Sequence, residues 1–341
     1  MNISSANRSS AAIELDFSEN VNPLGIPSGL RSILTGNVWE ASADTDINEL
    51  VRKLSRAEHI PEENIVCGNG TGDLINRIIS VLRPEKALIC APTFGGYKNS
   101  LLINGCSVTE LQLSPDNSFA VTSDIAESIT ENTDIFFLCS PNDPAGEVIT
   151  PYTMSIIAEK CSISGTTLVC DESLMGFVER SSRFSLKSNI KENMIVLSSY
   201  SELYGFSGLP VACGFFGDAR TAGKVRELGA YSVFSRAGLK AVSAALEDPS
   251  FLLKTKKCIE EERLFLSQSL TAMGLMVYPS KANFLLFRCE PDIDELLAKR
   301  GIIIRNCAGY TGLDSTYYRI AVRSHEDNAR LISEIARLLC R

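Results

Sequence analysis

Residues 199–210 have the sequence SYSELYGFSGLP, and they follow an apolar run at residues 194–198. A second apolar run, at residues 211–216, comes directly after them. Apolar runs of this length, bounded by Gly, Ser and Pro, are typical of buried strands. The stretch is therefore predicted to connect two strands of one sheet, and Glu202 is its one charged side chain.

The same pattern recurs along most of the chain. Further strand-like runs occur at residues 64–67, 87–90, 107–113, 135–139 and 166–170. Helical patterns separate most of them, at residues 71–81, 94–104, 123–128 and 152–162. Strands that alternate with helices predict an α/β fold with a wound, mostly parallel sheet, here of seven strands.

The pattern changes after about Gly229. A helical region covers residues 239–273, with a break at Pro249, and four short strands are expected at residues 275–278, 283–288, 302–305 and 317–322. The chain ends on an amphipathic helix, for which Ser324 and Asp327 form the N-terminal cap. We therefore predict a loose tail at residues 1–12 and a segment at 13–40 that packs with the C-terminal domain. A large domain at 41–228 and a smaller α/β domain at 229–341 complete the division.

Composition limits the classes of function. The 341 residues are 45% hydrophobic and 22% charged, with a net charge of -8, which argues against binding to nucleic acid or to an anionic membrane. No apolar run approaches the roughly 20 residues that span a bilayer, and the N-terminus lacks the apolar core of a signal peptide. We expect a cytoplasmic protein.

The cysteines and histidines give no metal-binding pattern. The 11 cysteines include no Cys-x-x-Cys pair, and only two histidines are present. Cys90, Cys139, Cys170 and Cys213 fall in strand-like runs, so we expect reduced thiols that are buried as small apolar side chains. No metal site is predicted.

Several polar segments occur in a fixed order along the chain. They are LDFSENVNPLG at 15–25, GNGTGD at 68–73, SPNDPAG at 140–146, DE at 171–172 and the stretch at 199–210, followed by PSKANF at 279–284, RNCAGYTGL at 305–313 and YRIAVR at 318–323. Their order and spacing resemble the class I/II aminotransferases, which are fold-type I pyridoxal-phosphate (PLP) enzymes. Within that family the segments resemble threonine-phosphate decarboxylases and, next, histidinol-phosphate aminotransferases. The resemblance implies the three-layer fold of that family.

The resemblance also implies cofactor-binding positions. Gly70, Thr71 and Gly72 precede a predicted helix, whose backbone N–H groups and dipole hold the cofactor phosphate in the family. An ordinary strand-to-helix turn is the alternative. Phe94 matches the ring that stacks on the pyridine, although a core phenylalanine is nearly as plausible. Asp171 matches the carboxylate that pairs with the pyridine nitrogen, with a turn cap as the alternative.

The segment at 199–210 departs from the family pattern. Ser199 and Ser201 match its cofactor-binding serines, but Glu202 stands where the family has the lysine that forms the imine. A carboxylate cannot form an imine. Pro210 replaces an arginine that binds the phosphate, and Asp143 replaces an amide that donates to the pyridine oxygen. An ionised aspartate has no donor to offer.

Two further departures concern tyrosines. Leu174 stands where related enzymes often have a tyrosine, and Ala41-Ser42-Ala43 replaces a Tyr-Pro pair. Loss of the lysine and the arginine removes two cations from the pocket as the family has it, while Glu202 and Asp143 add two carboxylates. Each interaction between one of these charges and a charge of the cofactor is worth about 1–4 kcal/mol at a few ångströms. We predict that PLP, if it binds, does so weakly and without a covalent bond, or that the pocket serves another ligand.

The substrate side keeps more of the pattern. Arg319 matches the arginine that holds the substrate carboxylate, and Arg305 matches a position used toward the substrate phosphate in threonine-phosphate decarboxylases. Asn20 and Asn22 lie in the segment that covers the site. A solvated surface charge is the alternative for either arginine. These residues predict a small ligand with a carboxylate, a phosphate or both.

Three hypotheses follow. The first is a diverged family member that binds such a ligand without imine chemistry, with Glu202 either serving as an acid or base or catalysing nothing. The second is a pseudo-subunit, because fold-type I sites lie at a dimer interface and a lysine-less chain can support a lysine-bearing homologue. The third is an enzyme that holds PLP or its amine form non-covalently. The resemblance implies a homodimer for the first and third, and a heterodimer for the second.

Overall fold

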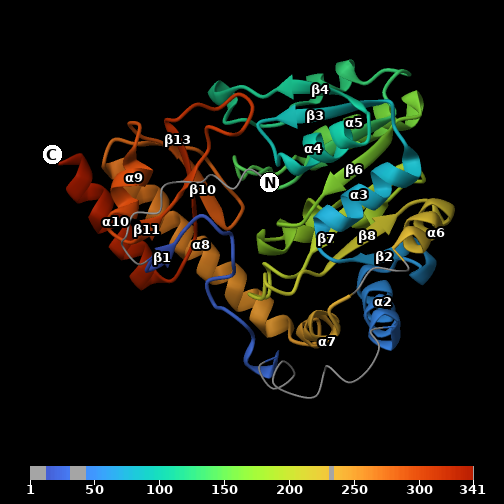
Figure 1. The fold of residues 1–341 in the computed structure, drawn as a ribbon, viewed down its shortest axis with the longest axis horizontal. Helices are drawn as coiled ribbons and strands as arrows, with labels where there is room; N and C mark the ends of the chain where they lie inside the picture. The colour runs from blue at the N-terminus through green and yellow to red at the C-terminus, as the bar shows by residue number, and fades with distance from the viewer. Residues whose placement is uncertain (1–12, 31–43, 230–233, 341) are drawn as a thin grey trace.

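The computed structural model describes residues 13–30, 44–229 and 234–340 (Figure 1). At its centre is a seven-stranded sheet, which confirms the predicted fold class. In spatial order its strands are β2 (Ile65–Gly68), β8 (Ala212–Phe216), β7 (Met194–Ser199), β6 (Thr167–Asp171), β5 (Ile135–Cys139), β3 (Lys86–Ala91) and β4 (Ser107–Gln112). Only β8 runs antiparallel to its neighbours among the described pairs. The sheet is therefore mostly parallel, as predicted.

Helices cover both faces of this sheet. Because successive side chains of a strand point to opposite faces, Phe136 and Phe137 of β5 belong to different apolar clusters. One face packs against α3 (Thr71–Leu82), α4 (Gly96–Ile103) and α6 (Ala219–Leu228). The other packs against α5 (Pro151–Ser164), and toward the β2 edge against α2 (Asp44–Glu58) and α7 (Arg236–Ala245). The result is a three-layer arrangement.

The C-terminal part of the chain forms a second, antiparallel sheet. Its order is β12 (Arg305–Asn306), β13 (Tyr317–Ala321), β10 (Phe284–Arg288) and β9 (Met276–Val277). The helices α8 (Pro249–Ala272), α9 (Ile293–Ala298) and α10 (His325–Leu339) pack against the face of it that carries Leu285, Phe287 and Ile320 (Figure 1). Near the N-terminus, β1 (Leu15–Asp16) pairs in parallel with β11 (Ile302–Ile303), so residues 15–16 lie beside this C-terminal part.

Most element predictions are confirmed, and two are corrected. The helix expected at 123–128 is a 3-10 helix, η3 (Ser123–Ser128). The strand expected at 302–305 is split between two sheets, because Ile302 and Ile303 pair with β1 whereas Arg305 pairs with Arg319 of β13. Ser324 caps α10 by accepting the Asp327 N–H, as predicted. Ala41-Ser42-Ala43 and the tail at 1–12 lie outside the described residues.

The cysteine prediction is also confirmed. Cys90, Cys139, Cys170 and Cys213 are buried free thiols in strands. Within the described ranges, no group of three or more His, Cys, Asp or Glu side chains is placed to hold a metal ion. The helices of the described chain also include none with the length and apolar character needed to cross a bilayer.

Candidate functional site

The parallel strands bring the predicted site residues to one edge of the large sheet. Asp171 is the last residue of β6 and Ser199 the last of β7, while Asp143 follows β5 by four residues. Because parallel strands end at the same edge, the loops after them meet there. The glycines before α3 reach this edge after β2.

A cavity of about 470 Å³ lies at this edge. Nine of the predicted residues line it, namely Asn20, Thr71, Gly72, Phe94, Asp143, Asp171, Ser199, Glu202 and Arg319. The alternative of a core phenylalanine is wrong for Phe94, whose side chain is 41% exposed. Leu174, which stands at a position where related enzymes often have tyrosine, also lines the cavity.

Glu202 faces this cavity from the loop that follows β7. Its side chain is half-buried and accepts a hydrogen bond from the Ser199 hydroxyl. The backbone carbonyl of Glu202 accepts the N–H of Asn22 at 3.1 Å, which ties the loop to the N-terminal segment. The carboxylate is thus held at the cavity wall by a neighbour three residues earlier in the chain.

Asp171 is buried at the end of β6, the strand that neighbours β7. One carboxylate oxygen accepts the backbone N–H of Ser173 at 2.9 Å as well as its hydroxyl, and the other accepts the Tyr97 hydroxyl at 2.6 Å. Burial raises the pKa of Asp171, the hydrogen bonds oppose this, and the charge of Glu202 raises the pKa further. Asp171 and Glu202 therefore interact electrostatically across one cavity.

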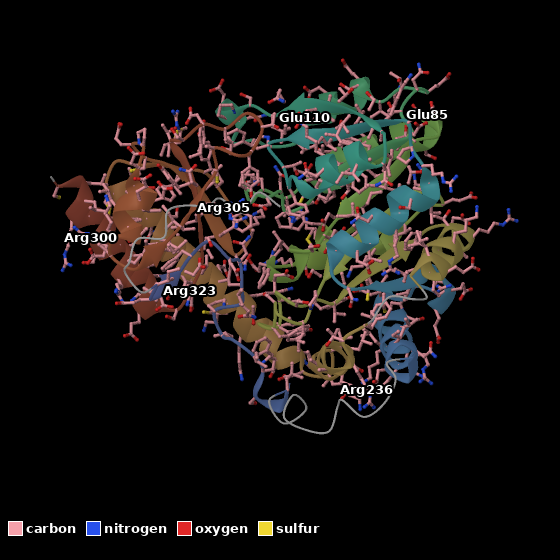
Figure 2. The ribbon with its side chains drawn as sticks, in the orientation of Figure 1. Glu85, Glu110, Arg236, Arg300, Arg305 and Arg323 are labelled. Atoms are coloured by element: carbon pink, nitrogen blue, oxygen red, sulfur yellow. The ribbon has the colours of Figure 1, made fainter. Side chains whose placement is uncertain are left out.

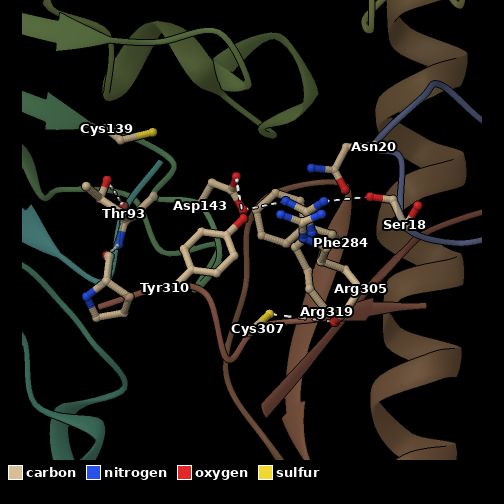
Figure 3. A network of polar contacts seen from close by, with 12 residues as sticks. Ser18, Asn20, Thr93, Cys139, Asp143, Phe284, Arg305, Cys307, Tyr310 and Arg319 are labelled. Atoms are coloured by element: carbon tan, nitrogen blue, oxygen red, sulfur yellow. Dashed lines mark hydrogen bonds and ion pairs between the residues drawn. The ribbon is translucent and has the colours of Figure 1, made fainter. Parts of the chain in front are cut away.

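Asp143 forms an ion pair with Arg319 (Figure 3). Both side chains are largely buried, with 14% and 8% of their surface exposed. Asp143 also accepts a hydrogen bond from the Tyr310 hydroxyl at 3.2 Å. Burial and the Asp143 charge both raise the pKa of Tyr310, so this hydroxyl remains a donor. The carboxylate of Asp143 is thus fixed between a guanidinium and a phenol.

Arg319 is held from three sides. It donates to Asp143 through Nη1 and to the carbonyl oxygen of Ser18 through Nη2, at 2.7 Å, and its guanidinium lies 5.2 Å from the Phe284 ring centroid. Burial lowers the pKa of Arg319, but Asp143 and Tyr310 outweigh it and the net shift is upward. Its Nε is buried without a hydrogen-bond partner. The alternative of a solvated surface arginine is wrong for Arg319.

A second cavity, of about 610 Å³, adjoins the first and shares Phe94, Asp143 and Arg319 with it. Arg305 lines this second cavity. Its side chain lies on the part of the C-terminal region that faces the seven-stranded sheet (Figure 2). The Nε of Arg305 is also buried without a hydrogen-bond partner. Of the described lysines, only Lys98 lines either cavity, and it pairs with Glu110 at 2.6 Å.

Three predicted residues do not line either cavity. Asn22 is buried and donates to the Leu203 carbonyl and to Thr255, so it joins the N-terminal segment to the protein interior. The hydroxyl of Ser201 accepts the Val211 N–H at 2.7 Å and fixes the loop instead. Gly70 has a φ of 80° and lies next to Pro210, since a Cβ atom added to it would be 3.2 Å from the proline Cβ.

Sequence reasoning missed the residues that orient the carboxylates. Tyr97 and Ser173 hold Asp171, while Tyr310 and the Ser18 carbonyl complete the Asp143–Arg319 pair. Tyr97 lies three residues after Phe94 in the chain, and its ring stacks on Phe137 of β5 at 5.2 Å. That spacing was the available signal, because the helix expected at residues 94–104 would place the two aromatic side chains one turn apart.

Comparisons with known proteins identify the family of this chain. A sequence model described as Aminotransferase class I and II matches residues 29–335. The chain belongs to the class I and II aminotransferase family. A threonine-phosphate decarboxylase of Salmonella typhimurium is 36% identical over 337 residues, which cover 95% of this chain and 91% of that protein. A histidinol-phosphate aminotransferase of Methanococcus maripaludis is 27% identical over 301 residues, covering 85% of this chain and 80% of the relative.

Solved structures of this family share the fold. A histidinol-phosphate aminotransferase from Clostridium acetobutylicum superposes with a TM-score of 0.87 at 22% identity, covering 96% of this chain and 99% of that one. A histidinol-phosphate aminotransferase from Sinorhizobium meliloti, solved in complex with pyridoxal-5'-phosphate, gives a TM-score of 0.85 at 20% identity, covering 96% and 92%. At these identities the likeness establishes the fold.

The residues of the cavity do not fit PLP as the aminotransferase family holds it. Glu202 faces the cavity with a carboxylate and has no amine to offer. Pro210 lies against the glycine turn before α3 and carries no charge for a phosphate. Asp143 is a carboxylate already paired with Arg319. The first cavity is lined by four carboxylates, from Glu19, Asp143, Asp171 and Glu202, and by the single cation Arg319 among the described residues. A dianionic phosphate is poorly matched to that wall.

Proposed function

We propose that this chain is a lysine-less aminotransferase-family protein that binds a small phosphorylated or carboxylated ligand without forming an imine. The observation that supports the proposal most directly is the position of Glu202. By the resemblance of the sequence around it, Glu202 takes the place of the imine-forming lysine, and it faces the cavity together with Asp171. A carboxylate at that place removes the family's covalent attachment to PLP.

The charges around the cavity support the same proposal. Glu202 and Asp171 have no paired cation in the first cavity, because Arg319 is already engaged by Asp143. Each additional like-charge contact with a bound phosphate at a few ångströms costs on the order of 1–4 kcal/mol at surface-like dielectric. Two such contacts cost about 2–8 kcal/mol, which is a large part of the roughly 8 kcal/mol of binding energy in a micromolar complex. The wall is therefore unsuited to PLP even without a covalent bond.

In this proposal, the anionic group of the ligand binds in the second cavity. Arg305 lines it, and its guanidinium forms no ion pair with the described residues, so its charge is available to a ligand. A guanidinium suits a phosphate or carboxylate because its planar N–H groups match two oxygens at once. Since the two cavities share Phe94, Asp143 and Arg319, one small ligand can reach both.

If the protein is an enzyme, Glu202 is the residue that exchanges a proton with the ligand. Its carboxylate faces the cavity, and the Ser199 hydroxyl donates to one of its two oxygens. A carboxylate at hydrogen-bond distance from a ligand N–H or O–H can accept or return that proton. Asp171, held by three hydrogen bonds, is less available for this role.

The test is covalent capture of PLP. The wild-type protein is incubated with PLP, its imine absorbance is recorded, and any imine is reduced with borohydride and located by mass spectrometry. We expect no adduct in the cleft of the wild type. The Glu202→Lys/Pro210→Arg variant should gain the imine band and an adduct at position 202.

The matched control is Glu202→Gln/Pro210→Arg, which restores the phosphate-binding cation but provides no amine. It should gain no adduct. A reduced adduct of the wild type at Lys98, the lysine of the neighbouring cavity, would overturn the proposal. Absence of an imine in the Glu202→Lys/Pro210→Arg variant, in a folded protein, would contradict the assignment of Glu202 to the lysine position.

A further inference from the structure

The arginine that faces both cavities already holds a carboxylate. Asp143 occupies Nη1 of Arg319, and the Ser18 carbonyl occupies Nη2. A two-point grip on a ligand carboxylate needs two parallel N–H groups. Of the three guanidinium nitrogens, Nε is the one without a partner. An incoming carboxylate would have to share Nη1 and Nη2 with these two acceptors, and it would lie beside the charge of Asp143.

The rest of the first cavity offers acceptors. Glu202 and Asp171 contribute carboxylate oxygens, and the side-chain oxygen of Asn20, which also lines the cavity, is buried without a hydrogen-bond partner. An ammonium group has three N–H donors and no acceptor, so it complements such a wall. A ligand carboxylate, which has acceptors alone, does not.

We propose that the cleft selects an amine that carries no carboxylate beside its amino group, with Asp143 as the residue that excludes the carboxylate by occupying Arg319. The ammonium lies between Glu202 and Asp171, and an anionic group at the far end of the ligand lies on Arg305. This rests on the proposed function, because the site must be free of an imine-bound cofactor. It narrows that function to phosphorylated amines over phosphorylated amino acids.

Two small molecules make the test direct. Phosphoethanolamine and phosphoserine share a phosphate and an ammonium, and they differ by one carboxylate. Their dissociation constants for the purified wild type are measured by titration calorimetry at one pH and salt concentration. We expect phosphoethanolamine to bind at least about tenfold more tightly, a difference of about 1.4 kcal/mol.

The variants assign the effect to residues. Asp143→Asn keeps the shape of the side chain and frees Arg319 from its charged partner, so phosphoserine should gain at least about tenfold in affinity. Glu202→Gln should weaken phosphoethanolamine, and Arg305→Met should weaken both probes by a similar factor. Glu334→Gln makes the carboxylate-to-amide change at another partly buried ion pair, that with Arg300, and should leave the ratio unchanged.

The inference is overturned if the wild type binds phosphoserine as tightly as phosphoethanolamine, or more tightly. It is also overturned if neither probe binds. If Asp143→Asn does not fold, the Glu202→Gln measurement decides, since unchanged binding of phosphoethanolamine contradicts the ammonium site. These failures are distinct from failure of the proposed function. A PLP adduct in the wild-type cleft would refute that function, whereas poor discrimination with no adduct refutes the selectivity alone.

Discussion

Replacing Arg319 by methionine tests the central ion pair of the cleft. Methionine fills much of the same volume with an unbranched side chain, but it removes the guanidinium. Asp143 would then remain with 14% of its side chain exposed and with the Tyr310 hydroxyl as its remaining partner. The Ser18 carbonyl would lose a charged donor at 2.7 Å. The change therefore leaves a charge and an acceptor unpaired in a largely buried place.

The expected cost follows from those contacts. Removing one partner of a buried ion pair costs about 3–5 kcal/mol. Loss of the bond to Ser18 adds on the order of 1 kcal/mol, and retention of the Tyr310 bond offsets a similar amount. We expect Arg319→Met to lower the free energy of unfolding by about 4 kcal/mol. Replacing both partners, in Arg319→Met/Asp143→Leu, should recover at least half of that loss, because apolar side chains substitute for buried pairs with little net cost.

The assay is urea-induced unfolding followed by circular dichroism, with the two variants and the wild type compared at one pH. Arg300→Met is the matched control. Its ion pair with Glu334 involves an arginine with 27% of its side chain exposed, so a loss of about 1 kcal/mol or less is expected. A loss below about 1 kcal/mol for Arg319→Met would refute the buried pair. So would a double variant no more stable than Arg319→Met.

Three further predictions concern the surroundings of the site. Burial raises the pKa of Glu172 from 4.5 to about 7, so its contribution to stability is present below pH 4.5 and is lost as the pH rises toward 7. Glu172→Gln should remove that pH dependence, which amounts to about 3 kcal/mol at 1.36 kcal/mol per pKa unit, in unfolding curves taken across this range. Ser324→Ala should cost about 1 kcal/mol of unfolding free energy in urea, because its hydroxyl accepts the Asp327 N–H. Tyr97→Phe should cost about 1.5–3 kcal/mol in the same assay, because it removes a donor from buried Asp171.

Each of these predictions has a control on the protein surface. Glu192→Gln changes an exposed glutamate and should leave the pH dependence intact, so an equal loss of slope would contradict the role of Glu172. Ser333→Ala lies exposed within α10, where alanine is the better helix former, and it should not destabilise. Tyr152→Phe removes an exposed hydroxyl, and a cost equal to that of Tyr97→Phe would argue against a specific bond to Asp171.

The strands were predictable because the sequence itself carries their signal. A parallel strand buried on both faces must be apolar along its whole length, and residues 135–139 and 194–198 have that composition. The observed β5 and β7 begin at the predicted residues and end within one residue of the predicted ends. The Ser324 cap was likewise visible, since a capping hydroxyl acts on a residue three positions later.

Contacts between distant segments were not predictable in this way. Asp143 and Arg319 are 176 residues apart, and no local pattern indicates that they pair. The split at residues 302–305 depends on β1 and β13, which approach from opposite ends of the chain. The prediction that Asp143 has no donor to offer a cofactor oxygen took no account of Arg319. The ion pair changes the effect of having an aspartate at this position, because Asp143 neutralises the charge of Arg319 and also competes with a ligand for it.

The substitutions at the site are mutually compatible, and this bears on why they occur together. Glu202 is held by the Ser199 hydroxyl, Pro210 lies against Gly70, and Asp143 is paired with Arg319. A pocket that had merely lost its cofactor would be expected to contain new charges without partners, because each buried unpaired charge costs several kcal/mol and nothing would select its neighbours. Here Asp143 is paired with a cation and Glu202 accepts a hydrogen bond, and the acceptors that remain open face a single cavity. That arrangement favours a pocket maintained for a ligand with donors where PLP has acceptors.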